Sequence, residues 1–161
     1  MRSLLALLAL SIAALSVEAG DTAKVESSAN FCFFLPPKPG GGIAEHEDDA
    51  IAFCTKKSLA PGANEFPPGF ILSAHFKQEK NYVQVTGRIN PDKYKLSRRD
   101  EGGQYDTKAP IGAKCAGFSS FVNLVEPNDG NYCIRCCKDP KDCDTRHSEN
   151  GCRDVIPGDY S

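Results

Sequence analysis

The stretch "NYCIRCCKDPKDCDTRHSENGC", from Asn131 to Cys152, holds five of the chain's eight cysteines and decides how the fold is held together. Clustered cysteines serve as metal ligands, as redox thiols or as halves of disulfides. The choice depends on the compartment, because disulfides persist outside the reducing cytosol. The N-terminal residues of the chain give the first indication of that compartment.

The chain begins with "MRSLLALLALSIAALSVEAG", which has the layout of a secretory signal peptide. Arg2 supplies the positive start, residues 4–15 are almost entirely apolar, and Val17 and Ala19 stand where a signal peptidase reads. We therefore predict a signal peptide over residues 1–19 and an extracellular protein. A membrane anchor is the alternative, but a spanning helix needs about 20 apolar residues, more than this run offers. We expect no membrane span and a secreted location, with cell-wall association as a further option.

An even number of cysteines in a small secreted chain predicts a disulfide framework. Zinc is the first alternative, with the C-x2-C of "CIRCC" and His147 as ligands, but Cys143 and Cys152 do not form a second close pair. A redox C-x-x-C is the second, and it would require a helix start that "CCKDP" does not resemble. We predict disulfides, with no metal and no cofactor. The cysteines concerned are Cys32, Cys54, Cys115, Cys133, Cys136, Cys137, Cys143 and Cys152.

The connectivity cannot be deduced from the sequence, but the parity of the cysteines constrains it. Three cysteines lie at or before Cys115 and five at or after Cys133, so both groups are odd. If all eight pair, at least one disulfide joins the two groups and ties the C-terminal region to the rest. Neighbouring Cys136 and Cys137 are expected to pair with different partners. Each disulfide typically contributes about 2–4 kcal/mol to stability.

Short apolar runs separated by proline and glycine predict an all-β fold. The clearest strand is residues 82–89, "YVQVTGRI", where Val83 and Val85 alternate with Gln84 and Thr86. This period of two predicts one buried and one solvent-facing side. Further strands are predicted at residues 31–35, 50–54, 70–76, 118–126 and 132–137. The pattern is typical of a compact, disulfide-stapled β-sandwich or barrel with long Pro/Gly loops.

The composition is that of an ordinary globular protein and not that of a strongly charged protein that binds nucleic acid. It has 161 residues, 19 Lys and Arg against 21 Asp and Glu, and a net charge of −2. Basic residues are not in excess, so we expect no nucleic-acid partner. After the signal peptide we expect a loose segment over residues 20–30 and a single disulfide-rich β domain over residues 31–161.

Several short segments together resemble a known group of proteins. "NFCFFLPPKPGGG", "IAFCTK", "YVQVTGRIN", "DEGGQYD", "APIGAKC", "NYCIRCC" and "NGCRDVIPGDY" occur in this order. The chain resembles small secreted cysteine-rich fungal proteins of the macrophage-activating glycoprotein, or immunoreactive mannoprotein, group, from about Asn30 to Tyr160. The resemblance implies a fungal source, an extracellular or cell-wall location and visibility to a host. It carries no defined activity and no catalytic residues.

The segment "RRDEGGQYD", residues 98–106, is the strongest candidate for a binding site. Gly102 and Gly103 allow a tight loop that directs nearby acids toward one point, where they can accept hydrogen bonds from sugar hydroxyls. The same carboxylates could hydrolyse a polysaccharide. The structural alternative is a turn in which the glycines take positive φ and the acids cap neighbouring amides. The candidate ligand-binding residues are Asp100, Glu101, Tyr105 and Asp106.

Three other features are weaker candidates. The acidic run "EHEDD", residues 45–49, offers oxygen ligands for calcium but lacks the spacing of a known loop, so a solvated turn is the main interpretation. Ser73 and His75 share a strand face but lack an evident orienting group or oxyanion site. Tyrosine rings can stack on sugars, although core packing is the simpler interpretation for each. The further tyrosines with this potential are Tyr82, Tyr94 and Tyr132.

Taken together, the residues favour an extracellular binding or host-interaction module, of the effector or antigen kind, over an enzyme. The expected partner is a cell-wall glycan or a host protein. One alternative is a small secreted hydrolase acting on polysaccharide through the carboxylates of residues 100–106. The other is a toxin or inhibitor whose scaffold presents the "PPKPGGG" or "RRDEGG" loop.

Overall fold

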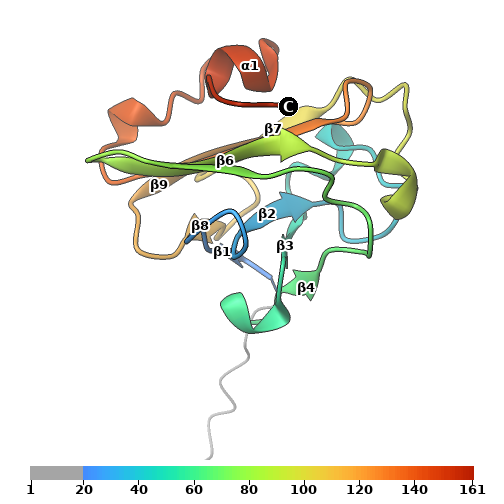
Figure 1. Ribbon diagram of the computed structural model, residues 1–161, viewed down its shortest axis with the longest axis horizontal. Coiled ribbons are helices and arrows are strands. Elements are labelled where there is room, and N and C mark those ends of the chain that lie inside the picture. The colour runs from blue at the N-terminus through green and yellow to red at the C-terminus, as the bar shows by residue number, and fades with distance from the viewer. Residues whose placement is uncertain (1–19) are drawn as a thin grey trace, which may run out of the picture.

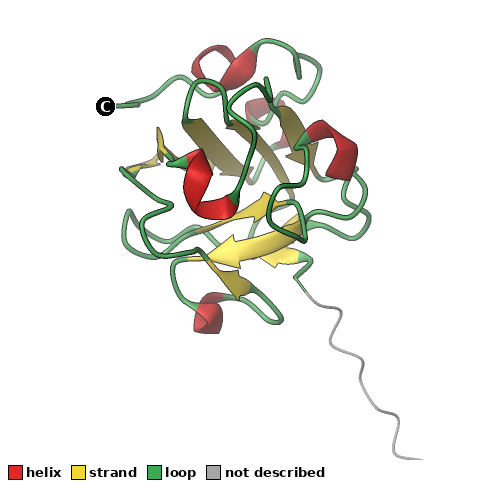
Figure 2. Cartoon of the chain, turned by 90° about the vertical axis from the view of Figure 1, so that its right-hand side faces the viewer, coloured by secondary structure: helices red, strands yellow, loops and turns green. Residues whose placement is uncertain are grey.

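The computed structural model describes residues 20–161, so the signal peptide predicted over residues 1–19 lies outside the described residues. Ten strands and five short helices follow one another along the chain, and loops and turns cover much of the surface around them (Figure 2). The strands are β1 (Thr22–Ala23), β2 (Cys32–Leu35), β3 (Ile51–Cys54), β4 (Asn64–Glu65), β5 (His75–Gln78), β6 (Tyr82–Arg88), β7 (Gly103–Asp106), β8 (Lys114–Cys115), β9 (Ser120–Glu126) and β10 (Asn131–Cys137). The helices are η1 (Ala44–His46), η2 (Lys57–Leu59), η3 (Pro91–Tyr94), η4 (Pro140–Asp142) and α1 (Gly151–Val155). The prediction of an all-β, disulfide-stapled fold is confirmed.

A five-stranded antiparallel sheet, in the order β5-β6-β10-β9-β7, organises the molecule (Figure 1). β10 lies at its centre, with Tyr132 opposite Gly87 of β6 and Val125 of β9. The turn "PNDG" joins β9 to β10, as its proline and glycine predict. The central strand therefore carries the start of the cysteine-rich motif and is paired with β6 along one edge and with β9 along the other.

One face of this sheet is covered by the three-stranded sheet β2-β3-β4 (Figure 1). The interface is largely aromatic: Phe33 of β2 stacks on Tyr132 with ring centroids 4.6 Å apart, and Phe34 lies 5.2 Å from Phe121. The side chain of Asn123 accepts a hydrogen bond from the backbone N–H of Phe34 at 2.9 Å. These side chains are fully buried, and each such aromatic group contributes about 1.5–3 kcal/mol through burial alone.

The opposite face of the sheet corrects one prediction. Gln84 and Thr86 were expected on a solvent-facing side of β6, but each is 1% exposed. The C-terminal segment, residues 143–161 with α1, lies over this face (Figure 1). Gln84 donates a hydrogen bond to the Pro157 carbonyl at 3.1 Å, and Thr86 donates one to the Asp159 carbonyl at 2.6 Å. The polar side chains are buried because they satisfy carbonyls of a segment that has no strand partner.

Four disulfides use all eight cysteines, which confirms the predicted framework and leaves no free thiol for zinc or redox chemistry. Adjacent Cys136 and Cys137 point to opposite faces of β10, because successive strand residues alternate. The bond that joins the early and late cysteine groups, as parity requires, connects Cys136 to Cys115. The four pairs are Cys32–Cys54, Cys115–Cys136, Cys133–Cys152 and Cys137–Cys143.

The disulfides divide between the two faces. Cys115–Cys136 lies within the aromatic core, whereas Cys133–Cys152 and Cys137–Cys143 belong to a second, smaller cluster under the C-terminal segment. That cluster also contains Ile156 and Tyr160, whose hydroxyl donates to the Ile156 carbonyl at 2.7 Å. The C-terminal segment is therefore attached to the sheet by two covalent links and an apolar cluster of its own.

Two local predictions differ from the structure. Residues 20–30 were expected to be loose, but β1 pairs in parallel with β8, and Ala23 and Val25 are buried. The two paired strands are about 90 positions apart in the chain, as Thr22 opposite Lys114 shows, so no local sequence pattern reveals their pairing. The strand expected at residues 70–76 begins only at His75 and continues to Gln78.

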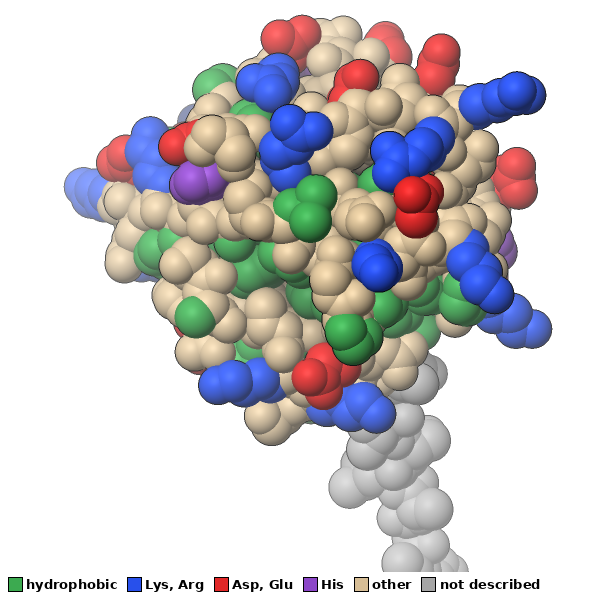
Figure 3. Space-filling model, turned by 45° about the vertical axis from the view of Figure 1, so that its right-hand side comes forward, with side chains coloured by type: hydrophobic (Ala, Val, Ile, Leu, Met, Phe, Trp, Pro, Cys, Tyr) green, Lys and Arg blue, Asp and Glu red, His purple; other side chains and the backbone are tan. Residues whose placement is uncertain are grey.

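The exposed surface carries no large apolar face in the view of Figure 3. Hydrophobic side chains are visible there in small groups, and charged side chains of both signs surround them (Figure 3). The large hydrophobic side chains that are exposed among residues 20–161 are Leu72 and Ile111. Isolated exposures of this kind are common and do not define an interface.

Candidate ligand-binding site

Three neighbouring hollows meet at Gly102, within the predicted loop. Gly102 has φ +96°, and a side chain there would overlap the Val125 carbonyl, so only glycine fits. The central hollow has a volume of about 380 Å³ and includes Ala44, Glu47, Asp106 and Glu149 in its lining. Its size lies within the range of small-molecule sites, about 300–1,000 Å³.

The other two hollows flank the central one. The loop hollow, about 520 Å³, lies between residues 40–45 and residues 97–102. The helix hollow, about 240 Å³, lies where β9 ends near α1 and includes Glu126 and Gly151. Both share Gly102 with the central hollow, and the three adjoining hollows together are called the recessed surface below.

Asp100 has a structural role in this surface. One carboxylate oxygen accepts from the backbone N–H of Ile43 at 2.9 Å, and the other accepts from Gly102 at 2.8 Å. The first bond links Ile43, which directly follows the "PPKPGGG" loop, to the "RRDEGG" loop, and the second lies within the "RRDEGG" loop. The structural alternative, in which acids cap neighbouring amides, therefore describes Asp100 correctly.

The predicted convergence of three acids on one point does not occur. Asp100 lines the loop hollow, Asp106 lines the central hollow, and exposed Glu101 lies between the loop and helix hollows. Asp106 accepts from the Lys108 backbone N–H at 2.8 Å and from the Gln104 side chain at 2.9 Å. The three acids line adjoining hollows and do not converge on one of them.

Tyr105 is not a ligand-stacking residue. It is fully buried, and its hydroxyl donates to the Ile43 carbonyl at 2.8 Å. Burial raises the pKa of its hydroxyl far above the ordinary range. The prediction that Tyr105 contacts a ligand failed because this residue lies on strand β7, whereas the two glycines before it had indicated a loop. Tyr94 and Tyr132 are buried as well, and the ring of Tyr82 lies under the Arg135 guanidinium at 4.1 Å.

The recessed surface is acidic although the chain as a whole is nearly neutral. Seven carboxylates line the three hollows, against the two cations Arg99 and Lys108. Four of the seven were outside the predicted site and come from distant parts of the chain. The seven are Glu45, Glu47, Asp100, Glu101, Asp106, Glu126 and Glu149.

Glu126 differs from the other acids because it is half-buried. Desolvation raises the pKa of its carboxyl above the usual range, although the Cys152 backbone N–H donates to it at 3.1 Å and opposes the shift. Glu126 ends β9, and its hydrogen bond to Cys152 in the first turn of α1 places the C-terminal segment against the end of β9.

Gln104 is a second residue that sequence reasoning missed. It lies on β7, is 9% exposed and lines the central hollow. Its side-chain N–H groups donate to Asp106 and to the Thr145 carbonyl at 3.0 Å. The alternation of "GQYD", with buried Tyr105 on the other side of the strand, is the signal that could have identified it.

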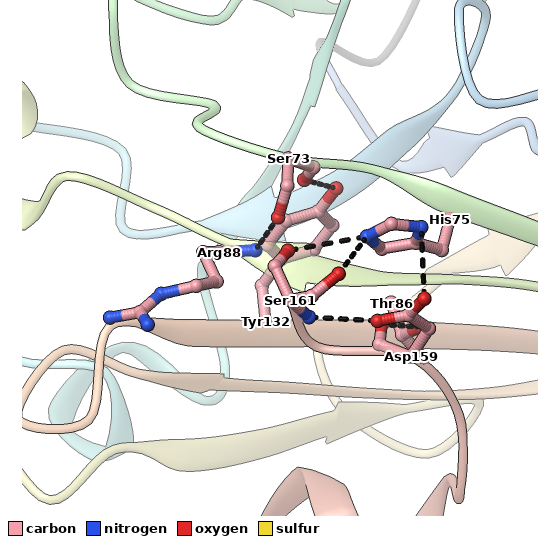
Figure 4. A network of polar contacts seen from close by, with 7 residues as sticks. All are labelled: Ser73, His75, Thr86, Arg88, Tyr132, Asp159 and Ser161. Carbon is pink, nitrogen blue, oxygen red and sulfur yellow. Dashed lines mark hydrogen bonds and ion pairs between the residues drawn. The ribbon is translucent and has the colours of Figure 1, made fainter.

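Ser73 and His75 do not form a nucleophile pair. The Ser73 hydroxyl accepts from the Arg88 backbone N–H, and His75 instead lies between Asp159 and Ser161 (Figure 4). His75 Nδ1 is 3.5 Å from the Asp159 carboxylate, and Nε2 is 3.3 Å from the Ser161 hydroxyl. Nε2 also lies 3.2 Å from the Ser161 carbonyl oxygen, so both of its contacts are with Ser161 and none is with Ser73. The contacts hold the C-terminal residues against β5.

The acidic run at residues 45–49 does not form a calcium loop. His46 and Asp49 pair with each other at 2.8 Å, while Glu45 and Glu47 line different hollows. Across residues 20–161, no three His, Cys, Asp or Glu side chains are grouped closely enough to hold a metal ion. Within the same range, no helix is long and apolar enough to cross a membrane.

Comparison with known proteins finds two fungal relatives. The chain is 29% identical over 161 residues to appressorium protein ROW1 of Mycosarcoma maydis, with 87% of this chain and 37% of the relative covered. It is 26% identical over 163 residues to appressorium protein ROW2 of the same fungus, with 84% and 53% covered. No family model and no solved structure matches the chain.

The chain thus spans between about a third and a half of the length of the curated relatives that it matches. The relatives are consistent with a fungal secreted protein family, and together with four disulfides they are compatible with an extracellular or cell-surface protein. Neither relative is named as a mannoprotein, so the resemblance to the macrophage-activating group stays a prediction. The chain is similar to appressorium proteins over most of its described length.

Proposed function

We propose that the protein is secreted by a fungus and acts outside the cell as a binding module where the fungus meets its host. The observation that carries this proposal is the similarity to two appressorium proteins over 87% and 84% of the chain. An appressorium is the cell that a fungus forms on a host surface. The four disulfides support it, because such bonds suit a small protein that works in an oxidising environment.

The recessed acidic surface is the proposed binding site, and a cell-wall glycan is the proposed partner. Sugar hydroxyls are hydrogen-bond donors, and the carboxylates of Glu101, Asp106 and Glu149 are acceptors at the edges of open hollows. Two of these residues, Glu101 and Asp106, are also ligand contacts predicted from the sequence. A host protein is the alternative partner.

No observation favours the hydrolase alternative. A pair of glycosidase carboxylates flanks one bond, with one group acting as acid and the other as base or nucleophile. Asp100 and Asp106 line different hollows, and backbone N–H groups already bind both carboxylates. The toxin or inhibitor alternative requires a projecting loop, whereas Asp100 of the "RRDEGG" loop is bound to the backbone of Ile43, the residue after the "PPKPGGG" loop.

The experiment is a binding screen with matched variants. Protein recovered from the culture medium is tested against fungal and host wall polysaccharides, and then the Glu101→Gln/Asp106→Asn variant is compared with Glu65→Gln. Glu65 is exposed on β4 and lines none of the three hollows, so it controls for the loss of charge. The proposal predicts glycan binding that falls about tenfold in the site variant only.

Two results would contradict the proposal in different ways. Binding that survives in the site variant would remove the acidic surface as the site. Absence of binding to every polysaccharide, with capture of a defined host surface protein instead, would replace the glycan by a protein partner.

A further inference from the structure

The turn at residues 97–100 presents two adjacent arginines to solvent. Arg98 and Arg99 are both exposed, and so is Ser97 before them. The Asp100 backbone N–H closes the turn by donating to the Ser97 carbonyl at 3.0 Å. The turn lies on the connection between η3 and β7. Exposed polar loops of this kind are the preferred positions at which endoproteases cut folded proteins, so the peptide bonds of this turn are candidates for cleavage.

The two guanidinium groups are available for recognition by a protease. Arg98 forms an ion pair with Asp92, with nitrogen–oxygen distances of 2.9 and 3.0 Å, and Arg99 lines the open loop hollow. An exposed ion pair contributes little to stability, so a carboxylate of another protein can replace Asp92. A protease that cleaves after a basic residue holds that residue in a pocket with a carboxylate at its base. Two adjacent arginines therefore offer two contacts of this type.

The second basic pair of residues 20–161, Lys56 and Lys57, serves as an internal comparison. Both lysines are exposed and lie in a short hydrogen-bonded turn around η2, so exposure does not distinguish the two pairs. The residue type does, because arginine binds a carboxylate through a planar fork of N–H groups, whereas lysine presents a single point charge. A protease that requires two charged contacts should therefore prefer the arginine pair.

Asp100 limits how far a break in the turn would spread. Its carbonyl accepts from the Asn128 backbone N–H at 2.9 Å, and its carboxylate accepts from two further backbone N–H groups. A protease has to displace some of these bonds when it extends the turn, so the folded protein should be cut more slowly than a free peptide. After the cut, the same bonds can hold the new N-terminus in place.

No disulfide among residues 20–161 crosses the bond between Arg99 and Asp100. Cys32–Cys54 lies entirely before this bond, and the other three disulfides lie entirely after it. Cleavage would therefore give two fragments that have no covalent link to each other, although each contains at least one disulfide of its own.

The core would hold the two fragments together after cleavage. β6, which precedes the cut, pairs along its whole length with β10, which follows it. Phe33 stacks on Tyr132 across the same division, and the Phe34 backbone N–H donates to Asn123. The side chains of these four residues are fully buried, so separation of the fragments would expose a large apolar surface to water. The cut protein should therefore keep its fold as two chains.

We propose that an endoprotease specific for paired basic residues hydrolyses the bond between Arg99 and Asp100 and gives a two-chain protein. Water adds across the peptide bond, which leaves a carboxylate on Arg99 and an ammonium group on Asp100. The inference goes beyond the proposed binding function and takes from it only secretion, which exposes the protein to proteases of the secretory route. Ser97 and Arg99 line the loop hollow, so cleavage frees part of the lining of the recessed surface.

The first test treats the purified protein with a subtilisin-type endoprotease specific for paired basic residues and follows intact mass and N-terminal sequence. The first cut is expected to give a fragment that begins at Asp100. Arg98→Gln retains an exposed side chain and should slow this cut about tenfold or more, because one charge-assisted contact is lost. Lys56→Gln is the matched control and should leave the rate unchanged. A first cut after Lys57, no cut, or equal cleavage of Arg98→Gln would overturn the inference.

The second test examines the protein that a fungal host releases into the culture medium. In denaturant without reductant, the wild-type protein should separate into two fragments, whereas Arg98→Gln should remain mostly one chain. In native buffer, both should elute from a sizing column as one particle of the same size. A single uncut wild-type chain, or fragments that separate in native buffer, would overturn the inference and leave the binding function standing. Absence of the protein from the medium would contradict the secretion on which both proposals depend.

Discussion

The two faces of the five-stranded sheet are buried in different ways. One face packs aromatic rings against β2, with Phe33 stacked on Tyr132. The other face buries Gln84 and Thr86 under a C-terminal segment that forms only a short helix. The first face combines aromatic packing with the disulfides Cys32–Cys54 and Cys115–Cys136, whereas the second combines two disulfides with side-chain hydrogen bonds to backbone carbonyls. A polar strand face can therefore be an interior face when an irregular segment folds over it.

The largest effect should come from the aromatic face. Phe33→Ala removes a fully buried ring and is expected to lower the free energy of unfolding by about 3–5 kcal/mol, because the cavity cannot be refilled. Chemical denaturation followed by tyrosine fluorescence measures it, with Phe33→Leu as the milder control. A loss below about 1 kcal/mol would show that this face does not form the main core.

Removing one disulfide on each face sharpens the comparison. The Cys133→Ser/Cys152→Ser variant should lose about 2–4 kcal/mol, and amides of residues 152–161 should exchange faster with solvent. The Cys32→Ser/Cys54→Ser variant opens a loop of similar length, with sequence separations of 22 and 19, but should leave that segment protected. Equal deprotection in both variants would mean that the C-terminal segment is not attached by its own disulfides.

The polar contacts under the segment should have a smaller, measurable effect. Gln84 accepts from Arg135 at 2.8 and 3.0 Å and donates to Pro157, so Gln84→Leu removes two of the hydrogen bonds of a half-buried guanidinium, which keeps its bond to the Asp142 carbonyl, and leaves the Pro157 carbonyl without this donor. We expect a loss of about 1–3 kcal/mol in thermal or chemical denaturation. Gln78→Leu, at the exposed end of β5, is the matched control and should change little. If neither substitution lowers stability, the side of β6 that carries Gln84 faces solvent, as the sequence pattern predicted.

The smallest effect has the opposite sign and depends on pH. Because burial raises the pKa of Glu126, its protonated form stabilises the fold, and this stabilisation is present below the unfolded pKa and is lost as pH rises through the folded pKa. Glu126→Gln keeps an acceptor for the Cys152 N–H. It should therefore increase stability by up to about 1 kcal/mol near neutral pH and lose that advantage in acid. A destabilised variant at neutral pH, or a difference independent of pH, would contradict the assignment.

The strands that form the aromatic face could be predicted from the sequence because their signals are local. The runs around Phe33 and Ile134 are apolar, and parity of the cysteines required a link between distant segments, which Cys115–Cys136 supplies. The polar face was predicted wrongly, because the alternation of Gln84 and Thr86 with apolar residues looks the same whether solvent or the C-terminal segment covers their side of β6. Only the long-range contact with residues 157–159 distinguishes the two.

The candidate site was predicted in part for the same reason. Glu101 and Asp106 are close in sequence to the glycines that shape the loop, and both line the recessed surface. Glu47 and Glu149 come from segments about 100 positions apart, and no spacing rule brings them together. Tyr105 was misplaced because the pairing of β7 with β9, which buries it, is likewise not local.

The most direct test of the two-faced sheet is a disulfide map of the secreted protein under non-reducing conditions. Cleavage after Glu126, Arg135 and Arg146 separates Cys115, Cys133, the Cys136–Cys137 pair and Cys152 into different peptides. We predict that no cysteine reacts with an alkylating reagent before reduction, and that Cys133 is linked to Cys152. Free thiols, or a link from Cys152 to Cys136, would place the C-terminal segment elsewhere and contradict the buried polar face.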